Sequence, residues 1–176
     1  MMRHSLVKIL FVVLCFVLPV RPQTNLVEVK SRKAAPDFTL ADSKEATIKL
    51  SNYKGRVVLL DFWATWCEGC KVEIPWYMEF QKKYKESGLS VVGVSVDDDG
   101  WKSVKPFIEA KQVNYPVVIG SWDLAGRFGS TSLPVTLLID RNGKIADSHV
   151  GMVDKDAFDA EIQVLLKKSA TKEPAK

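Results

Sequence analysis

A continuous apolar stretch that leads straight into two closely spaced cysteines constrains the fold of this 176-residue chain more than any other feature. The stretch "VVLLDFWA" has the length of a strand, and its apolar residues do not alternate with polar ones. That pattern predicts a central strand buried on both faces. The segment "TWCEGC" follows, and the apolar residues after it recur at helical spacing until Gly88. We therefore expect the cysteines where a buried strand passes into the amino end of a helix.

The other apolar runs predict strands that alternate with helices. Two more buried strands are expected in "LSVVGVSVD" and "YPVVIG", and a hairpin is expected to turn through Asn142–Gly143. The segment "DDGWKSVKPFIEAKQV" predicts an amphipathic helix that Pro106 interrupts or delays, with Asp98 or Asp99 as its N-cap. This order of elements predicts an α/β fold with a mixed central sheet and helices on both faces. Shorter strands are expected at "DFTL" and "ATIKL", a short helix or turn at "DLAGRFG", and a last helix at "DKDAFDAEIQVLLKK".

The first 22 residues differ from the rest of the chain. Arg3 and Lys8 stand in a start without acids, and twelve apolar residues follow them from Ile9 to Val20. This run is shorter than the ~20 residues of a membrane span, and it predicts a cleaved signal peptide, with a retained N-terminal membrane anchor as the alternative. Either would place the protein outside the cytoplasm, in the periplasm or an equivalent extracytoplasmic space. We expect one domain over residues 30–168 and a disordered basic tail over residues 169–176.

The net charge gives no reason to expect a nucleic-acid partner. The chain carries a formal charge of +4, but the three bases within residues 1–22 account for most of it. Without them, 22 bases face 21 acids, which leaves +1. A domain so close to neutrality lacks the basic surface that binding to phosphates requires.

Cysteine usage points to redox chemistry. Cys15 lies in the N-terminal apolar run, so Cys67 and Cys70 are the two thiols of the remaining chain. A helix amino terminus favours thiolate, which makes Cys67 the expected nucleophile that attacks a disulfide. Cys70, one turn further along, is expected to resolve the mixed disulfide that results.

Two acids are candidates for accepting the proton of Cys70. Asp61 stands inside the otherwise apolar strand, where burial should raise its pKa toward the working range. Glu73 follows Cys70 by three residues and shares its helix face, although a solvated helix position would explain it equally simply. The sequence leaves open which acid dominates.

Metal sites explain these residues poorly. Structural zinc usually takes four ligands, and besides the two cysteines the chain after its N-terminal segment offers only His149, which we expect to be an ordinary surface residue. The acidic run "DDDG" lacks the ligand spacing of a calcium loop. We therefore expect neither a metal nor a cofactor. Three tryptophans near the motif suit packing as well as substrate contact, and they are Trp63, Trp66 and Trp76.

The segment "VVLLDFWATWCEGCKVEIP" resembles the active-site segment of the thioredoxin superfamily, in particular its exported TlpA/ResA/DsbE-like thiol–disulfide oxidoreductases, which share a redoxin or AhpC/TSA-like domain. "APDFTLAD" resembles the opening strand of these proteins, and "TSLPVTLLIDRNGKI" resembles their cis-proline segment. The resemblance implies a thioredoxin fold with an N-terminal strand extension and a helix–strand insert in its centre. It also implies that Pro134 is cis and that Leu133 places its backbone beside the bound substrate chain. Of the three tryptophans, we take Trp66, next to Cys67, as the candidate substrate contact.

The resemblance includes two departures. Glu68 and Gly69 stand between the cysteines where relatives usually have Gly-Pro or Glu-Pro, and this dipeptide tunes the redox potential. Val135 stands where a threonine is usual. Neither the potential nor the substrate contacts can therefore be transferred directly from the family.

The function that the resemblance implies is reduction of disulfides in extracytoplasmic proteins by a monomer that a membrane-linked dithiol donor re-reduces. Apocytochrome c, in cytochrome c maturation, is one candidate client, although no residue selects it. A peroxiredoxin is an alternative, but the proline expected upstream of a peroxidatic cysteine is missing before Thr65. A Cu(I) chaperone is another, but such proteins usually space their cysteines by three residues and add a histidine.

Overall fold

The computed structural model describes residues 24–167 and contains a mixed five-stranded sheet with the strand order β5-β4-β3-β6-β7. Strand β3 lies at its centre, pairing in parallel with β4 and antiparallel with β6. The mixed central sheet predicted from the sequence is therefore confirmed. The proposed signal segment and the basic tail both lie outside the described residues. The strands are β3 (Val57–Trp63), β4 (Leu89–Ser95), β5 (Val117–Ile119), β6 (Val135–Ile139) and β7 (Ile145–Val150).

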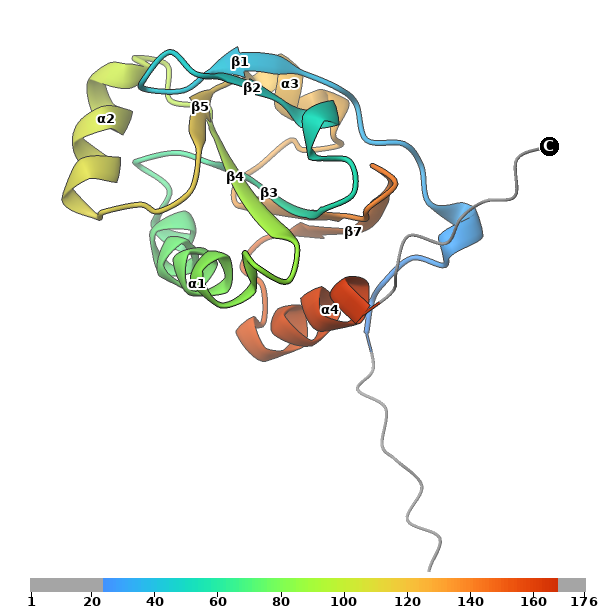
Figure 1. The fold of residues 1–176 in the computed structure, drawn as a ribbon. Coiled ribbons are helices and arrows are strands. Elements are labelled where there is room, and N and C mark those ends of the chain that lie inside the picture. The colour runs from blue at the N-terminus through green and yellow to red at the C-terminus, as the bar shows by residue number, and fades with distance from the viewer. Residues whose placement is uncertain (1–23, 168–176) are drawn as a thin grey trace, which may run out of the picture.

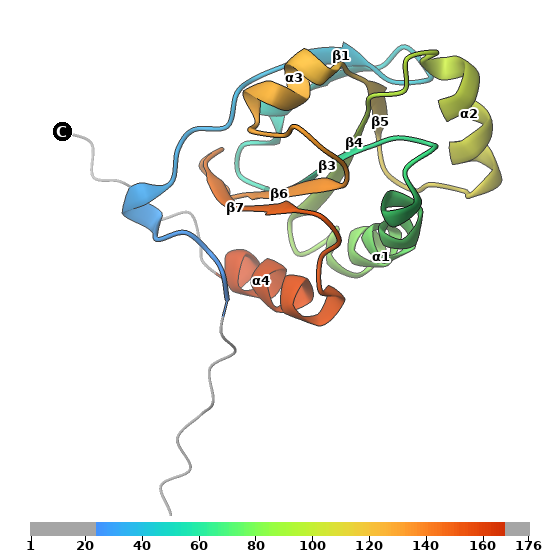
Figure 2. The same cartoon turned by 180° about the vertical axis from the view of Figure 1, so that it is seen from behind.

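Helices cover both faces of this sheet (Figures 1 and 2). The helices α1 (Glu68–Tyr84) and α4 (Lys155–Lys167) lie on one face. Helix α3 (Trp122–Arg127) lies on the other face, together with an N-terminal hairpin. Helix α2 (Trp101–Ala110) lies beside β5 and belongs to the expected helix–strand insert. The hairpin consists of β1 (Thr39–Ala41) and β2 (Thr47–Lys49), and two short 3₁₀ helices cover Val29–Ser31 and Leu50–Tyr53.

The core follows from the sequence of β3, all seven residues of which are buried. Successive side chains of a strand point to opposite faces, so neighbouring residues face different helices. Phe62 packs against Phe128 on the α3 side, with ring centroids 5.3 Å apart. Asp61 therefore points to the α1 side, where it is 1% exposed.

Helix α2 differs from the sequence prediction in two ways. It begins at Trp101 after Gly100, which is the N-cap with φ of 57°, so the expected cap by Asp98 or Asp99 is wrong. Pro106 lies inside the helix and neither interrupts it nor delays its start. A proline removes the hydrogen bond to the carbonyl four residues earlier, here that of Lys102. Both residues are exposed, so water can satisfy that carbonyl.

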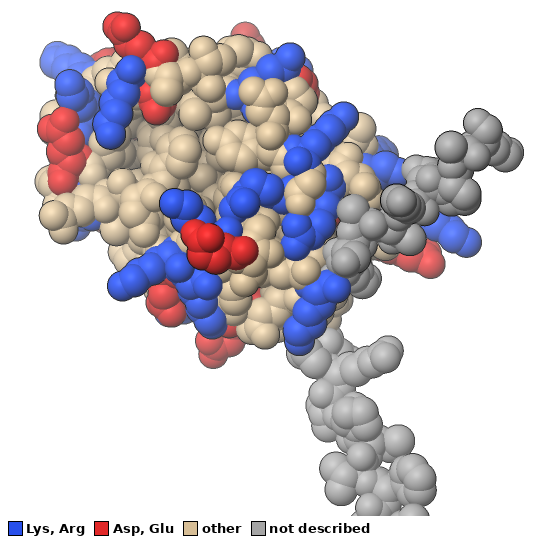
Figure 3. Space-filling view, viewed as in Figure 1, with Lys and Arg blue, Asp and Glu red and all other residues tan. Residues whose placement is uncertain are grey.

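Within residues 24–167, no helix is both long and apolar enough to cross a bilayer. Figure 3 shows basic side chains spread over one face with acidic side chains among them.

Candidate active site

The two cysteines lie where β3 gives way to α1. Cys67 is the N-cap of α1, and Cys70 lies in its first turn. Their sulfurs form a disulfide of 2.05 Å. Figure 2 shows this end of α1 at the same edge of the sheet as the start of β6 and the end of β7. The segments that lie beside the cysteines in space, the start of β6 and the end of β7, therefore come from distant parts of the chain.

The two sulfurs differ in their surroundings. Cys67 is 7% exposed, whereas Cys70 is fully buried. The backbone N–H of Cys70 donates a hydrogen bond to Sγ of Cys67 at 3.2 Å. Donors at a helix amino end stabilise negative charge, so the geometry favours a thiolate at Cys67 more than at Cys70.

Asp61 lies in the apolar interior on the α1 face. Neither of its carboxyl oxygens has a hydrogen-bond partner among the described residues. Burial raises the pKa of Asp61 well above its ordinary value, and the negative charge of Glu73 raises it further. The direction of this shift is the one that the sequence predicted, and it lets the acid keep its proton to a higher pH than a solvated carboxyl would.

Glu73 is fully buried, so the interpretation of it as a solvated helix residue is wrong. One turn after Cys70, it points into the protein because it shares the inward face of α1. Its Oε1 accepts the backbone N–H of Val153 at 2.6 Å, and its Oε2 has no partner among the described residues. Burial raises the pKa of Glu73, while the Val153 N–H, the Tyr77 hydroxyl and His149 act in the opposite direction.

A row of polar side chains continues from Asp61 across the sheet. Asp61 pairs in register with Thr136 of β6, and Thr136 pairs with His149 of β7. Residues directly opposite each other in neighbouring strands share a face, so all three lie on the α1 side. The Tyr77 hydroxyl of α1 and Oγ1 of Thr136 are hydrogen-bonded at 2.7 Å. His149 is half-buried, and its Nε2 lies 3.1 Å from the carbonyl oxygen of Met152. His149 is therefore in contact with the segment that packs on the dipeptide between the cysteines.

One of the predicted substrate contacts, Pro134, lies close to the dipeptide between the cysteines. The bond between Leu133 and Pro134 is cis, as the resemblance implied. Trp66 is 59% exposed and is available to a partner. Gly69 lies close to this segment, because a Cβ added there would be 3.4 Å from Cδ of Pro134.

Two further residues at this site escaped the sequence prediction. A Cβ on Gly69 would also lie 3.2 Å from Cγ of Met152, so Met152 packs on the dipeptide between the cysteines. Met152 and Val150 are 52% and 61% exposed, so both apolar side chains are accessible to a partner. The sequence signal was the apolar run "HVGMV" at the end of a predicted strand, interrupted by Gly151, whose φ is 89°.

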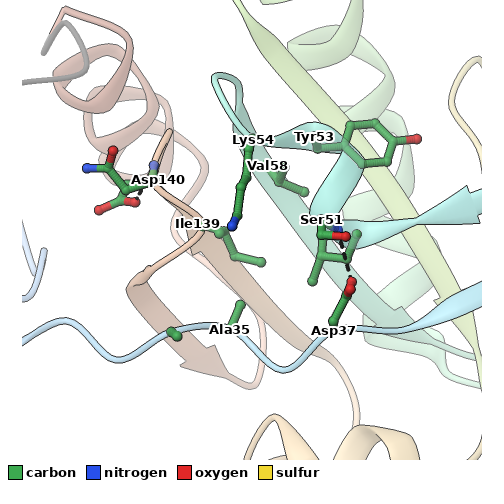
Figure 4. Close-up of a pocket in the computed structure, with 12 residues that line it drawn as sticks. Ala35, Asp37, Ser51, Tyr53, Lys54, Val58, Ile139 and Asp140 are labelled. Carbon is green, nitrogen blue, oxygen red and sulfur yellow. Dashed lines mark hydrogen bonds between the residues drawn. The ribbon is translucent and has the colours of Figure 1, made fainter. Parts of the chain in front are cut away.

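The cavity drawn in Figure 4 is not part of this site. It is lined by Val58 near the start of β3 and by Ile139 at the end of β6, whereas the cysteines follow the opposite end of β3. In Figure 4 the Asp37 carboxylate accepts the backbone N–H of Ser51 at 2.9 Å beside the cavity. Among residues 24–167 no group of three His, Cys, Asp or Glu residues could hold a metal ion.

The geometry defines the class of protein as one that exchanges a dithiol for a disulfide on a thioredoxin-like fold. Comparisons with known proteins agree. Residues 32–148 match the AhpC/TSA family. ResA, a thiol–disulfide oxidoreductase of Bacillus thuringiensis (strain Al Hakam), is 33% identical over 132 residues, which cover 74% of this chain and 76% of ResA. ResA of Geobacillus kaustophilus (strain HTA426) is 31% identical over 92% of this chain and 93% of its own.

Solved structures give the same result. A crystal structure described as a putative thiol:disulfide interchange protein DsbE from Chlorobium tepidum superimposes with a TM-score of 0.73 at 36% identity, covering 77% of this chain and 96% of its own. A pneumococcal exposed lipoprotein thioredoxin superimposes with a TM-score of 0.66 at 30% identity, covering 74% of this chain and 100% of its own. The chain belongs to the AhpC/TSA family and is a ResA/DsbE-like thiol–disulfide oxidoreductase with a Cys67–Cys70 pair.

Proposed function

We propose that this protein reduces disulfides of exported proteins, with Cys67 as nucleophile and Cys70 as resolving thiol. The observation that carries the proposal is the difference between the two sulfurs. Cys67 is the more accessible one and accepts a helix N–H, whereas Cys70 is fully buried beside it. A thiol–disulfide exchange needs one sulfur that meets the client and one that stays inside.

The reaction balances as two exchanges. The Cys67 thiolate attacks a client disulfide, forms a mixed disulfide and releases one client thiolate, which takes a proton from solvent. Cys70 then loses its proton and attacks Sγ of Cys67, which forms the Cys67–Cys70 disulfide and releases the second client thiolate. The client gains two electrons and the protein loses them.

The proton of Cys70 needs a nearby acceptor. Asp61 is the favoured one, because its two oxygens have no partner among the described residues and burial raises its pKa. Glu73 already accepts the Val153 N–H and serves to keep the pKa of Asp61 high through its charge. General-base assistance of this kind contributes roughly 10²–10⁴-fold to a proton-transfer step.

The client side of the site is an exposed apolar surface around the disulfide, which supports a polypeptide client. Trp66, Val150 and Met152 form this surface together with the cis-peptide segment at Pro134. The N-terminal apolar run in the sequence, and the exposed lipoprotein among the similar structures, support an extracytoplasmic location for the reaction. There a membrane-linked dithiol donor would restore the two thiols.

Trapping of the mixed disulfide tests this proposal. We expect the reduced protein to reduce insulin, Cys67→Ser to lose this activity, and Cys70→Ser to accumulate a covalent adduct with insulin through Cys67. The two variants are matched controls for each other, because each removes one sulfur of the same pair. Insulin reduction by Cys67→Ser, or an adduct through Cys70, would contradict the assignment of the nucleophile.

A peroxide assay tests the peroxiredoxin alternative. We expect no catalytic turnover of hydrogen peroxide by the reduced protein, because the segment before Cys67 lacks the upstream proline expected of a peroxidatic cysteine. Sustained peroxide consumption that survives Cys70→Ser would favour that alternative instead.

A further inference from the structure

The acidic run "DDDG" contains a buried residue for which the redox reaction, as described so far, has no role. Asp98 and Asp99 are exposed, but Asp97 is only 5% exposed. Asp97 follows the end of β4, next to the segment that connects β3 to Cys67. It is neither a calcium ligand nor the N-cap of α2, so its burial calls for another explanation.

Asp97 binds the turn that precedes Cys67. Its Oδ2 accepts the backbone N–H of Thr65 at 2.9 Å, and its Oδ1 accepts the Thr65 hydroxyl at 2.6 Å. The Ser95 hydroxyl donates a third hydrogen bond to Oδ2 at 2.8 Å. Both hydrogen-bonding donors of Thr65 are therefore held by one carboxylate from the segment after β4.

This turn determines where Cys67 lies. The N–H of Cys67 donates to the carbonyl of Ala64 at 3.1 Å, so the turn closes directly around Thr65. Charge-assisted hydrogen bonds such as those to Asp97 are stronger than neutral ones. Loss of them would loosen the connection that fixes Cys67 at the amino end of α1.

The Asp97 carboxylate also adds a negative charge near the nucleophile. Thr65 precedes Cys67 by two residues, and two residues span at most about 7 Å. The carboxylate therefore lies within about 10 Å of Cys67, where it opposes formation of a thiolate. Destabilising the thiolate destabilises the dithiol relative to the disulfide, which makes the pair a stronger reductant.

We propose that Asp97 is a positioning residue of the thiol site, which holds the Thr65 turn and keeps the Cys67–Cys70 pair reducing through its charge. The charge of Asp97 makes the cysteine pair more reducing, and the functional value of that effect rests on the reductase function proposed above. The contacts with Thr65 and the position of the charge do not depend on that function.

Three substitutions separate the charge from the hydrogen bonds. Asp97→Asn removes the charge and keeps an acceptor for the Thr65 N–H. Thr65→Val removes the hydroxyl and keeps the charge, and Thr65→Ser keeps both. Asp98→Asn is the matched control, because it removes the same charge from an exposed neighbour.

The first readout is alkylation of Cys67 in the reduced full chain as a function of pH, followed by mass spectrometry of the labelled peptide. We expect Asp97→Asn to alkylate about threefold faster at pH 6 and to shift the equilibrium with glutathione about threefold toward the dithiol. That shift corresponds to about 14 mV. Asp98→Asn and wild type should coincide. Coincidence of Asp97→Asn with Asp98→Asn would overturn the charge effect.

The second readout is the rate of insulin reduction, which tests the positioning effect even if Asp97→Asn does not fold. We expect Thr65→Val to be about fivefold slower with an unchanged alkylation midpoint, and Thr65→Ser to keep the wild-type rate. Equal rates of insulin reduction for the wild type, Thr65→Val and Thr65→Ser would overturn the positioning effect. Alkylation needs no client, so an Asp97→Asn shift in a protein that does not reduce insulin would contradict the reductase function and leave the role of Asp97 standing.

Discussion

The two faces of the central sheet differ in how well their buried groups are satisfied. On the α3 face, Phe62 packs against Phe128, and Phe38 lies 6.3 Å from Phe128 between ring centroids. On the α1 face, Asp61 is the immediate neighbour of Phe62 in sequence and has no hydrogen-bond partner for either carboxyl oxygen among the described residues. On this same face, one carboxyl oxygen of Glu73 has no hydrogen-bond partner within residues 24–167.

Within one sheet, the α3 face therefore contributes to stability, whereas the α1 face carries the groups that react. Buried apolar contacts stabilise the fold, whereas buried polar groups without partners reduce its stability. The unpartnered carboxyl oxygens lie on the face covered by α1, which carries the cysteines. Substitutions on the α3 face should therefore change stability alone, and substitutions on the α1 face should change reactivity as well.

Truncation on the α3 face should give the largest effect. Phe128→Ala removes a 5% exposed ring from the cluster with Phe38 and Phe62, and such changes cost about 3–5 kcal/mol. We expect the free energy of unfolding in urea to fall by that amount, with an unchanged equilibrium with glutathione in the folded protein. Trp122→Ala on the same helix is a control of small effect, because Trp122 is 39% exposed. A change in the redox equilibrium with Phe128→Ala would weaken the comparison of faces.

On the α1 face, Asp61→Asn should change reactivity and stability in opposite directions. Because the variant lacks the Asp61 carboxylate, we expect the resolving step by Cys70 to slow by roughly 10²-fold. Stopped-flow decay of the mixed disulfide measures this rate. Stability at pH 7 should increase, because the Asp61 carboxylate is costly to ionise in a buried position where it has no hydrogen-bond partner among residues 24–167. The gain follows from the raised pKa of Asp61, because a proton bound more tightly in the folded state makes ionisation cost folding free energy.

The difference in unfolding free energy between the wild type and Asp61→Asn should depend on pH. Folding raises the pKa of Asp61 above 3.8, so between that pH and the folded-state pKa the unfolded chain loses the proton first. Wild-type stability should therefore fall relative to Asp61→Asn as the pH rises through this window, and the two should converge below it. A gap in urea midpoints that is independent of pH would show that Asp61 is not the titrating group.

Glu73→Gln should have a smaller effect through Asp61. The glutamine can still accept the Val153 N–H, but it removes the negative charge that raises the pKa of Asp61. We expect the acid limb of the rate of client reduction to move to lower pH, by up to about one pH unit. A loss of activity as large as that of Asp61→Asn, with no movement of the limb, would make Glu73 the main proton acceptor.

The smallest effect is expected from the hydroxyl pair within the polar row. Tyr77→Phe leaves the Thr136 hydroxyl buried without its partner and should cost about 1 kcal/mol of unfolding free energy. Thr136→Val combined with Tyr77→Phe removes both hydroxyls and should recover part of that loss. Additive losses in the double-mutant cycle would mean that the hydrogen bond contributes nothing measurable.

The sequence predicted those parts of the site that depend on one residue and its near neighbours. The apolar run around Asp61 indicated burial, and the spacing of Cys67 and Cys70 indicated a pair at a helix start. Both follow from local pattern. The resemblance added the cis bond at Pro134, which composition and spacing alone do not reveal.

The remaining parts depend on contacts between distant segments. Glu73 is buried because the Val153 N–H, eighty positions away, satisfies one of its oxygens. Asp97 is buried because Thr65 of another loop binds it. Met152 reaches the cysteines only through a turn after β7. A single sequence does not show such pairings, so it left Glu73 between a proton acceptor and a solvated residue and did not single out Asp97 or Met152.

The reduction potential of the Cys67–Cys70 pair, measured by equilibration with glutathione or dithiothreitol, tests the central claim most directly. A reductase fed by an upstream dithiol donor should have a potential near or below that of thioredoxin, about −270 mV. A potential toward about −120 mV would make the protein an oxidant that introduces disulfides, and it would contradict the direction of electron flow proposed here.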